Sequence, residues 1–384
     1  MMTTINKAER PFRFFDNREK YLLFVTTCGE KWAIAERVGL ELSHINPQPP
    51  ALRLFDAGTG DGTVLTSVLR HMHEKFPTIP YLIVGKEISV EDVRMTLEKM
   101  SDRFSEHPQM VLVMTNMHYS EAPGLWPSSA DKAAQLHWEE VALEGETAHE
   151  FDVQIDSLQP RISEWWQVAV SEKTGNPRYR TPSVLVIYRA DQRFRLSAVI
   201  PDKAPRARDY DLVIAAQPYR VRQPAEHKVK IVLEPLARSL RSGGRMITIQ
   251  GTGQDPGMEI IRRVWPDEDP FHTPGPTLTE ALRSRLRAIM PDLDFWSHTD
   301  QHALFRYSLY VTPKEVRGHI GTSTLLAAWN AAVYVAQIDD TRVADAMSHS
   351  GYLDATREVL SRHGGLWFID ESFVVSRKSG QPYQ

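Results

Sequence analysis

Residues 54–65 read Leu-Phe-Asp-Ala-Gly-Thr-Gly-Asp-Gly-Thr-Val-Leu, an apolar run that ends at Asp56 and continues through Gly58, Gly60 and Gly62. Glycine accepts a positive φ and leaves space for a ligand over the backbone. The residues that follow have a helical pattern, and a helix N-terminus offers unpaired N–H groups to a carboxylate or phosphate. The stretch therefore predicts a strand, a ligand-binding turn and a helix.

The glycine spacing distinguishes between two classes of nucleotide ligand. A dinucleotide fingerprint needs Gly-x-Gly-x-x-Gly, but the third glycine comes one residue early here and Thr63 occupies its place. Binding of NAD is therefore disfavoured. The stretch resembles instead the first motif of the class I S-adenosylmethionine-dependent methyltransferases. That resemblance implies that Asp56, Gly58, Thr59, Gly60 and Gly62 contact S-adenosyl-L-methionine.

An acidic residue follows the next apolar run, as it does in that family. Residues 81–86 are mostly apolar and lead into Glu87, which stands where a ribose-binding carboxylate is expected after the first strand and helix. Glu87 could accept hydrogen bonds from both ribose hydroxyls. The alternative is a solvated carboxylate at a helix start, because Ser89 and Glu91 have the pattern of a helix N-terminus.

Two polar residues follow later strand-like runs. Residues 110–115 lead into Asn116, whose amide could donate to and accept from the adenine, although asparagine is also a common turn residue. Residues 210–216 lead into Gln217, which we expect at the same ligand-binding edge of the sheet. The resemblance places these runs as the third and fourth strands.

The remaining runs complete the pattern of the family. The helix, Gly-Gly turn and fifth strand are expected within 236–249, and the sixth and seventh strands at 306–311 and 366–376. The resemblance implies a Rossmann-like α/β sheet with strand order 3-2-1-4-5-7-6, in which strand 7 is antiparallel. A dehydrogenase sheet, by contrast, is built from two parallel halves.

The chain divides into three expected parts. Residues 1–50 form an N-terminal helical cap, residues 51–120 with 208–384 form the cofactor-binding domain, and residues 121–207 form a β-rich inserted subdomain. Helices are expected near 63–75 and 89–104 in the first half, and near 322–338 and 340–362 toward the end.

The insertion is predicted to be a small antiparallel subdomain. Four of its segments have the composition of strands: 151–155, 164–170, 183–188 and 194–200. Trp165 and Trp166 either belong to a dimer surface or pack the subdomain itself.

Candidate catalytic residues follow the fourth strand. Amino-group and nucleobase methyltransferases end this strand in Asn-Pro-Pro-Tyr or close variants, and residues 216–219 share only Pro218 and Tyr219 with it, which places a planar exocyclic amine acceptor in doubt. His227 and Tyr219 are the candidate catalytic residues. His227 is the candidate general base by residue type and place, or else a solvated residue at a helix start. Tyr21 and Trp32 could cap the cofactor or pack in the core.

Composition limits the classes of protein. The chain has 384 residues, of which 42% are hydrophobic and 24% charged, with a net charge of −4. The single cysteine, Cys28, excludes an internal disulfide or a thiolate cluster, and we expect no metal. Residues 1–13 do not have the pattern of a signal peptide, and no run is as long as a membrane span, so we expect a cytoplasmic protein.

The resemblance therefore implies an S-adenosylmethionine-dependent methyltransferase, and we expect a small-molecule substrate. No nucleic acid or membrane partner is expected, since the charge is slightly negative and no long basic run is present. A homodimer formed through the insertion is possible. Two alternatives stay open: transfer or cyclisation of the aminocarboxypropyl arm of the same cofactor, and a non-catalytic interaction module with this fold.

Overall fold

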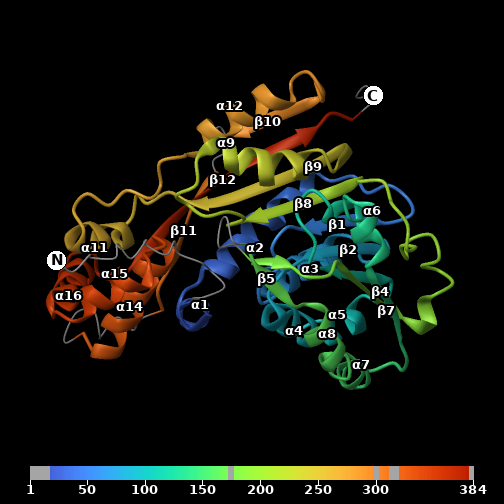
Figure 1. The fold of residues 1–384 in the computed structure, drawn as a ribbon, viewed down its shortest axis with the longest axis horizontal. Helices are drawn as coiled ribbons and strands as arrows, with labels where there is room; N and C mark the ends of the chain where they lie inside the picture. The colour runs from blue at the N-terminus through green and yellow to red at the C-terminus, as the bar shows by residue number, and fades with distance from the viewer. Residues whose placement is uncertain (1–17, 172–176, 298–301, 311–319, 380–384) are drawn as a thin grey trace, which may run out of the picture.

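A twisted, mostly parallel sheet runs through the computed structural model (Figure 1), which describes residues 18–171, 177–297, 302–310 and 320–379. Its strand order is β10-β12-β9-β8-β1-β2-β3-β7-β4, with β11 paired to β12. The strands span β1 (Leu52–Asp56), β2 (Tyr81–Lys86), β3 (Met110–Thr115), β4 (His137–Leu143), β7 (Ser183–Arg189), β8 (Tyr210–Ala216), β9 (Leu240–Gly251), β10 (Leu293–Ser297), β11 (Leu304–Ser308) and β12 (Trp367–Arg377).

The seven central strands have the predicted class I order. From one side they read β3, β2, β1, β8, β9, β12 and β10, which is 3-2-1-4-5-7-6 in the family's numbering. Strand β12 is antiparallel to both of its neighbours, β9 and β10, while β1, β2, β3, β8 and β9 are parallel. The Rossmann-like fold and the antiparallel seventh strand are therefore confirmed.

The sixth strand consists of two pieces. Strand β10 pairs with β12 from Phe373 to Arg377, and β11 continues along the same edge of β12 from Trp367 to Glu371. The prediction of a sixth strand at 306–311 identified only the second piece, and Val311 lies outside the described residues. The first piece, Leu293–Ser297, was missed because charged and polar residues interrupt its apolar pattern.

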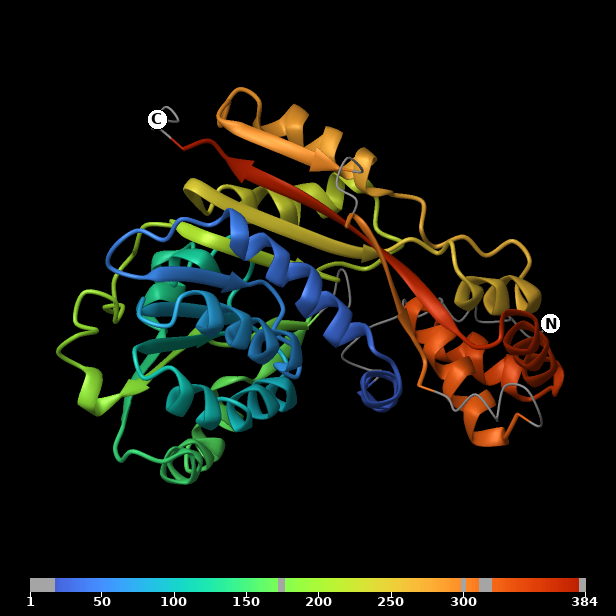
Figure 2. The same cartoon turned by 180° about the vertical axis from the view of Figure 1, so that it is seen from behind.

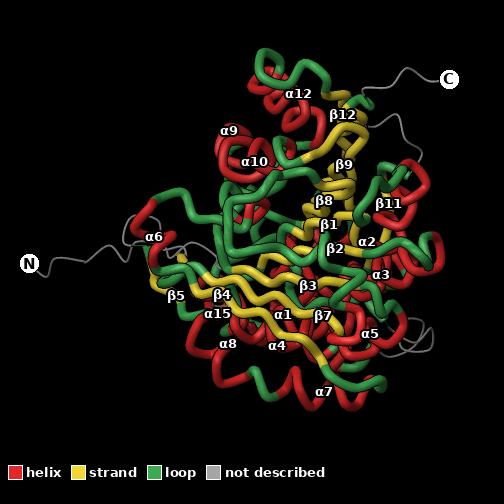
Figure 3. The backbone as a smooth tube through the Cα atoms, turned by 90° about the vertical axis from the view of Figure 1, so that its right-hand side faces the viewer, coloured by secondary structure: helices red, strands yellow, loops and turns green. Residues whose placement is uncertain are grey.

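Helices cover both faces of the sheet (Figure 3). One face packs against α9 (Ala225–Lys228), the π-helical turn Val229–Leu233, α10 (Glu234–Ala237) and α12 (Gly275–Leu286). The other face packs against α2 (Glu30–Glu41), α3 (Thr63–Lys75), α4 (Val90–Glu98), α5 (Ser101–Glu106), α7 (Ala148–Asp156) and α8 (Gln159–Trp165). Because both faces are covered, the central parallel strands are almost continuously apolar and buried.

A third apolar cluster lies at the far end of β11 and β12. It joins α1 (Arg18–Thr27), α11 (Pro256–Val264), α14 (Thr322–Val335), α15 (Asp340–Met347) and α16 (Gly351–His363). Figure 2 shows α1 between the main sheet and this helical lobe, with α2 running back across the sheet. Among the described helices, none combines the length and the apolar character that crossing a bilayer requires.

The insertion extends the main sheet, so the predicted separate antiparallel subdomain is wrong in its details. Strand β7 pairs antiparallel with β3, and β4 pairs parallel with β7. The insertion also contains α6 (Ala130–Ala134) and two short strands, β5 (Val168–Val170) and β6 (Pro177–Tyr179), which pair with each other. Two 3₁₀ turns, Ala122–Gly124 and Ala190–Gln192, lie in the insertion, and a third, Leu42–His44, follows α2.

Of the four strands predicted in the insertion, 183–188 is confirmed and the others need correction. Residues 151–155 lie in α7, which a capping box of Thr147 and Glu150 begins. Residues 164–170 contain the end of α8 and then β5. Residues 194–200 form turns whose buried side chains, Leu196 and Val199, are three residues apart, a spacing that alternation along a strand does not give.

The two consecutive glycines form a bulge inside β9 and not a turn before it. Tyr210 pairs with Leu240 but Leu212 pairs with Arg245, so residues 241–244 lie opposite Asp211 alone. A Cβ on Gly244 would lie 2.5 Å from the Tyr210 carbonyl oxygen, which is closer than van der Waals contact allows.

We predict that Gly244→Ala lowers the free energy of unfolding by about 1–3 kcal/mol, because the new methyl group overlaps backbone that the bulge holds in place. Gly351→Ala is the matched control: its Cβ would meet nothing within 4 Å at the start of α16, so its cost should be near zero. Urea denaturation of both variants measures the difference, and equal stabilities would contradict the structure of the bulge.

Candidate functional site

The glycine loop leads from β1 to α3 and is hydrogen-bonded to the end of β2. Gly60 and Gly62 have φ angles of +53° and +79°, which residues other than glycine seldom adopt. The Thr59 N–H donates to the Lys86 carbonyl oxygen at 3.2 Å, and the Gly62 N–H donates back to the Thr59 carbonyl oxygen at 3.0 Å. These bonds hold the loop at the carboxyl ends of the strands, where open α/β sheets bind ligands.

Gly58 is the open position of this loop. It is exposed, and a Cβ built on it would meet nothing within 4 Å. At Gly62, by contrast, a Cβ would lie 2.8 Å from the Thr96 Cα, so the reason for glycine there is internal packing. The protein itself therefore gives no steric reason for glycine at position 58, whereas a ligand lying over the loop would.

Glu87 lies against the glycine loop, as the sequence predicts. Its Oε2 accepts from the Gly60 N–H at 3.0 Å, and its Oε1 accepts from the Ile88 and Ser89 N–H groups at 2.7 and 2.9 Å. The Trp166 indole donates to the Glu87 carbonyl oxygen at 2.8 Å. The carboxylate is half-buried, and its orientation is fixed by backbone groups, so it is preorganised for a ligand over the loop.

Asp56 is buried at the end of β1 and accepts from the Gly58 N–H at 3.3 Å. Burial raises the pKa of Asp56 to about 7; the charge of Glu87 adds to the shift, while the bond from Gly58 and the charge of Lys31 oppose it. Burial and Glu87 likewise raise the pKa of Asp92, which pairs with Arg18, to about 6. Carboxyl groups this close to one another favour a cationic ligand.

Helix α1 covers the loop through Tyr21. The Tyr21 hydroxyl donates to Asp61 Oδ1 at 3.2 Å and accepts from the Asp61 N–H at 3.3 Å. Burial opposes the ionisation of Asp61, but the bond from Thr63 and the charges of Lys99 and Lys31 outweigh it and lower the pKa of Asp61. Tyr21 thus lies where a capping residue is expected.

Trp32, the other predicted capping residue, does not lie over the loop. Its side chain is 66% exposed on α2. Helix α2 presents its other face to the sheet, so Trp32 has neither the capping nor the core position that the sequence suggested.

Asn116 is brought to the ligand-binding edge but has protein partners there. Its amide nitrogen donates to the Thr181 and Trp165 carbonyl oxygens at 2.9 and 3.3 Å, and its Oδ1 accepts from the Ser183 N–H at 2.9 Å. The residue is 1% exposed. In this arrangement Asn116 ties the insertion to β3, and a contact with adenine stays a prediction.

The two tryptophans of the insertion pack inside this chain, Trp166 in the core beneath the main sheet and Trp165 against β4. Trp166 is 2% exposed, and Trp165 stacks on His137 with a centroid distance of 5.5 Å. This is the packing alternative of the sequence analysis, and a dimer through the insertion stays a prediction.

Gln217 ends β8 in an unusual conformation. Its φ is +48°, in the left-handed region, and its side-chain amide donates to Asp370 Oδ2 of β12 at 3.2 Å. Non-glycine residues in this region cost energy that the surrounding structure must offset, and they gather at functional sites. The structure thus links Gln217 to a buried carboxyl group that the sequence analysis did not consider.

The two predicted catalytic residues differ in their exposure to solvent. His227 is exposed on α9, while Tyr219 is 7% exposed with its hydroxyl donating to Gln250 Oε1 at 2.8 Å. Beside Tyr219 lies Lys228, whose ammonium is 4.7 Å from the ring centroid and donates to the Val221 carbonyl oxygen at 2.8 Å. Burial lowers the pKa of Lys228 to about 8. Tyr219 and Lys228 brace the loop after β8, and catalytic roles for His227 and Tyr219 stay predictions.

Sequence reasoning missed three residues at this edge. Lys31 of α2 lies close enough to Asp56 and Asp61 to affect their pKa values, and Tyr119 bonds the Pro218 carbonyl oxygen at 3.0 Å, joining the loops after β3 and β8. Asp370 is the third. Its signal was present, since two acids in the apolar run 366–376 are unexpected in a buried strand.

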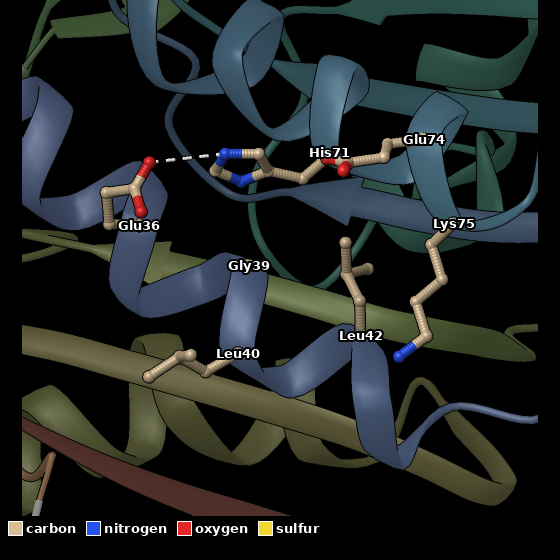
Figure 4. A pocket seen from close by; sticks show the side chains of 7 residues that line it. All are labelled: Glu36, Gly39, Leu40, Leu42, His71, Glu74 and Lys75. Atoms are coloured by element: carbon tan, nitrogen blue, oxygen red, sulfur yellow. Dashed lines mark ion pairs between the residues drawn. The ribbon is translucent and has the colours of Figure 1, made fainter.

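A pocket of the described residues lies away from this edge. It measures about 510 Å³ between α2 and α3, where His71 Nε2 lies 3.2 Å from Glu36 Oε1 (Figure 4). Helix α3 starts at the glycine loop, so its last turns lie at the opposite edge of the sheet. Within the described ranges no three His, Cys, Asp or Glu side chains gather as a metal site would require.

We predict that Asp56→Asn makes the protein more stable at pH 8 by roughly 2–4 kcal/mol and that this gain vanishes toward pH 4. A carboxyl whose pKa is raised by folding contributes stability that is lost as the pH rises through the folded value, here about 7. Urea denaturation from pH 4 to 8 measures the effect, with Asp267→Asn, an exposed site, as the control. A gain independent of pH would contradict the assignment.

Comparison with known proteins adds weak similarities. No family model and no curated protein sequence matches this chain. A geranyl diphosphate methyltransferase structure shares 12% identity and a TM-score of 0.33 over 90% of this chain and 77% of its own. A putative sarcosine dimethylglycine methyltransferase from Galdieria sulphuraria shares 10% identity and a TM-score of 0.33 over 94% of this chain and 86% of its own. The rRNA methyltransferase aviRa from Streptomyces viridochromogenes shares 15% identity and a TM-score of 0.25 over 56% of this chain and 72% of its own.

All three TM-scores are below 0.5, so the assignment of the fold depends on this chain's own strand order and loop. Seven strands in the order 3-2-1-4-5-7-6, an antiparallel seventh strand and a glycine loop after the first are present together. The chain has the fold of the class I S-adenosylmethionine-dependent methyltransferases.

Proposed function

We propose that this protein is an S-adenosyl-L-methionine-dependent methyltransferase that acts on a small-molecule acceptor. The observation that carries the proposal is that two features, Gly58 and Glu87, occur together at one loop. The first is a glycine that the protein's own packing does not require, and the second is a carboxylate held by three backbone N–H groups beside it.

The residues present suit this cofactor. Gly58, Thr59 and Gly60 would lie beneath it, and Glu87 would accept from the ribose hydroxyls. When bound, the cofactor supplies a methyl group on a positively charged sulfur. The acids at this edge, Asp56 and Glu87, favour such a cation over the negatively charged phosphates of a dinucleotide.

Positioning is the main task that remains for the protein. Holding two reactants in line and excluding water can account for roughly 7–11 kcal/mol of barrier. Helix α1 suits this task, because Tyr21 bonds Asp61 on the glycine loop and Arg18 pairs with Asp92 at 2.5 Å. The Asn330 side chain of α14 also donates to the Lys20 carbonyl oxygen at 3.1 Å, so α1 bridges the cofactor loop and the C-terminal lobe.

The acceptor is proposed to be a small molecule on the grounds of charge. The net charge of −4 and the lack of a long basic run give no general attraction to a polyanion. His227 and Tyr219 follow β8 in the chain, and Tyr219 remains the better placed of the two because it is part of the loop after that strand.

We predict that Gly58→Ala leaves the free energy of unfolding within about 0.5 kcal/mol of the wild type but weakens binding of S-adenosylhomocysteine at least tenfold. The new methyl group meets no protein atom within 4 Å, whereas it would occupy space beneath the ligand. Urea denaturation and isothermal calorimetry measure the two quantities.

Gly321→Ala is the control, because its Cβ also meets nothing within 4 Å and it lies at the start of α14. It should change neither quantity. Absence of binding to the wild type, or equal affinity of the Gly58→Ala variant, would refute the proposed site.

The product identifies the reaction. After incubation with S-adenosylmethionine and cell-derived metabolites, S-adenosylhomocysteine in the mass spectrum indicates methyl transfer, which is the expected result. Methylthioadenosine would indicate chemistry of the aminocarboxypropyl arm, and recovery of unchanged cofactor that nevertheless binds would indicate a non-catalytic module.

A further inference from the structure

Strand β12 carries a buried carboxyl group whose bonding is incomplete. Asp370 is 0% exposed, and its Oδ1 has no hydrogen-bond partner, while Oδ2 accepts from the Gln217 amide at 3.2 Å. Buried polar atoms in native proteins nearly always have a partner, and an exception calls for a physical reason such as a ligand.

Asp370 lies at the ligand-binding edge of the sheet. It pairs in register with Gly251, the last residue of β9, and a Cβ built on Gly251 would lie 3.7 Å from Asp370 Oδ1. Gln217 follows β8, the strand next to β1. The unbonded oxygen therefore lies at the same edge of the sheet as the glycine loop, where open α/β sheets bind their ligands.

The charges around Asp370 are mostly negative. Burial raises the pKa of Asp370 well above its usual range, the charges of Glu30 and Asp255 add to the shift, and Lys31 opposes it. Glu30 and Lys31 lie 3.2 Å apart in the first turn of α2, and Asp255 caps α11 by accepting from the Met258 N–H at 2.9 Å. Three acids against one lysine disfavour a carboxylate or phosphate group at this place.

A second buried polar atom without a partner lies on β11, the strand that pairs with β12 at this end. The Tyr307 hydroxyl of β11 has no hydrogen-bond partner, and the residue is 4% exposed. Burial raises the pKa of Tyr307, and Asp370 is the charged group that adds most to that shift. The hydroxyl and the carboxyl do not bond each other, so a ligand that both donates and accepts could satisfy the two together.

We propose that the acceptor of this enzyme is an amine, and that Asp370 is the residue that binds its nitrogen through Oδ1 and removes its proton. This inference rests on the proposed methyltransferase function. Gln217 is then a positioning residue, because its amide holds the other carboxyl oxygen. Because Asp370 is 0% exposed, entry of the amine requires displacement of the side chains that cover it.

The proton and electron balance is simple. An ammonium group pairs with the Asp370 carboxylate, and one N–H proton moves to Oδ1. The nitrogen lone pair then forms the new N–C bond to the methyl group as the C–S bond breaks, and the electrons of that bond stay on sulfur as a neutral thioether. The product carries the positive charge on nitrogen, and the carboxyl group releases its proton to solvent. No oxidant, reductant or further co-reactant is needed.

The test compares the wild type with Asp370→Asn, which keeps an oxygen acceptor for Gln217 and removes the ionisable group. The first measurement is calorimetric binding of S-adenosylhomocysteine, which should be unchanged in the variant. The second titrates the loaded protein at pH 7.5 with dimethylamine, benzylamine and phenethylamine, and with phenethyl alcohol as the uncharged match. Asp294→Asn, on β10, is the control for a carboxyl of the same sheet outside this cluster.

We expect at least one amine to bind the loaded wild type, with at least tenfold weaker binding to Asp370→Asn and none of the alcohol. Titration in two buffers of different ionisation enthalpy should show release of about one proton, because the neutral carboxyl ionises as the ammonium docks. The variant should release none.

Each failure has a distinct meaning. If S-adenosylhomocysteine does not bind the wild type, the proposed function itself fails. If it binds but no amine does, or if Asp370→Asn binds the amine as tightly as the wild type or releases the same proton, the inference about Asp370 is overturned and the proposed function stands.

Discussion

The hydrogen bond from the Gly60 N–H to Glu87 Oε2 joins the two parts of this protein on which a nucleoside site depends. It can form only because Gly60 accepts a left-handed backbone, which turns the loop after β1 toward the end of β2. The same carboxylate accepts from two further N–H groups at the start of the next helix, so its position is fixed before any ligand arrives. The parallel pairing of β1 and β2 brings both ends to one edge, and the remaining strands extend that edge in both directions.

Two carboxyl groups are buried at the ligand-binding edge of the sheet. Asp56 and Asp370 both lie inside the protein at strand positions where an apolar residue would be more stable, and burial raises the pKa of each. Proteins tolerate the energetic cost of burying an ionisable carboxyl group where that group serves binding or catalysis. A cation that enters the site lowers the free energy needed to ionise such a buried carboxyl group. Helix α1, which bonds the glycine loop through Tyr21, covers the same region and can exclude water from it.

Sequence patterns predicted the part of the fold in which local chemistry and global arrangement agree. The glycine loop, the acid at position 87 and most of the central strands were visible, because parallel strands buried on both faces read as apolar runs and glycines mark the turns. The order of the strands was implied by the resemblance to the methyltransferase family. The insertion was harder. Phe151 and Ile155 looked like strand residues, although the capping box at Thr147 and Glu150 indicated a helix. The sixth strand was found only in its second piece, since polar residues interrupt the first.

The site was predicted only in part, for a different reason. Residues on the glycine loop follow one another in sequence, so spacing reveals them, but Lys31, Tyr119 and Asp370 come from three distant segments that only the folded sheet brings together. The most direct test of the account is a crystal structure of the protein with S-adenosylhomocysteine. We predict density for the nucleoside over Gly58, with both ribose hydroxyls within hydrogen-bond distance of Glu87. Density elsewhere, or a ribose that makes no contact with Glu87, would contradict the account.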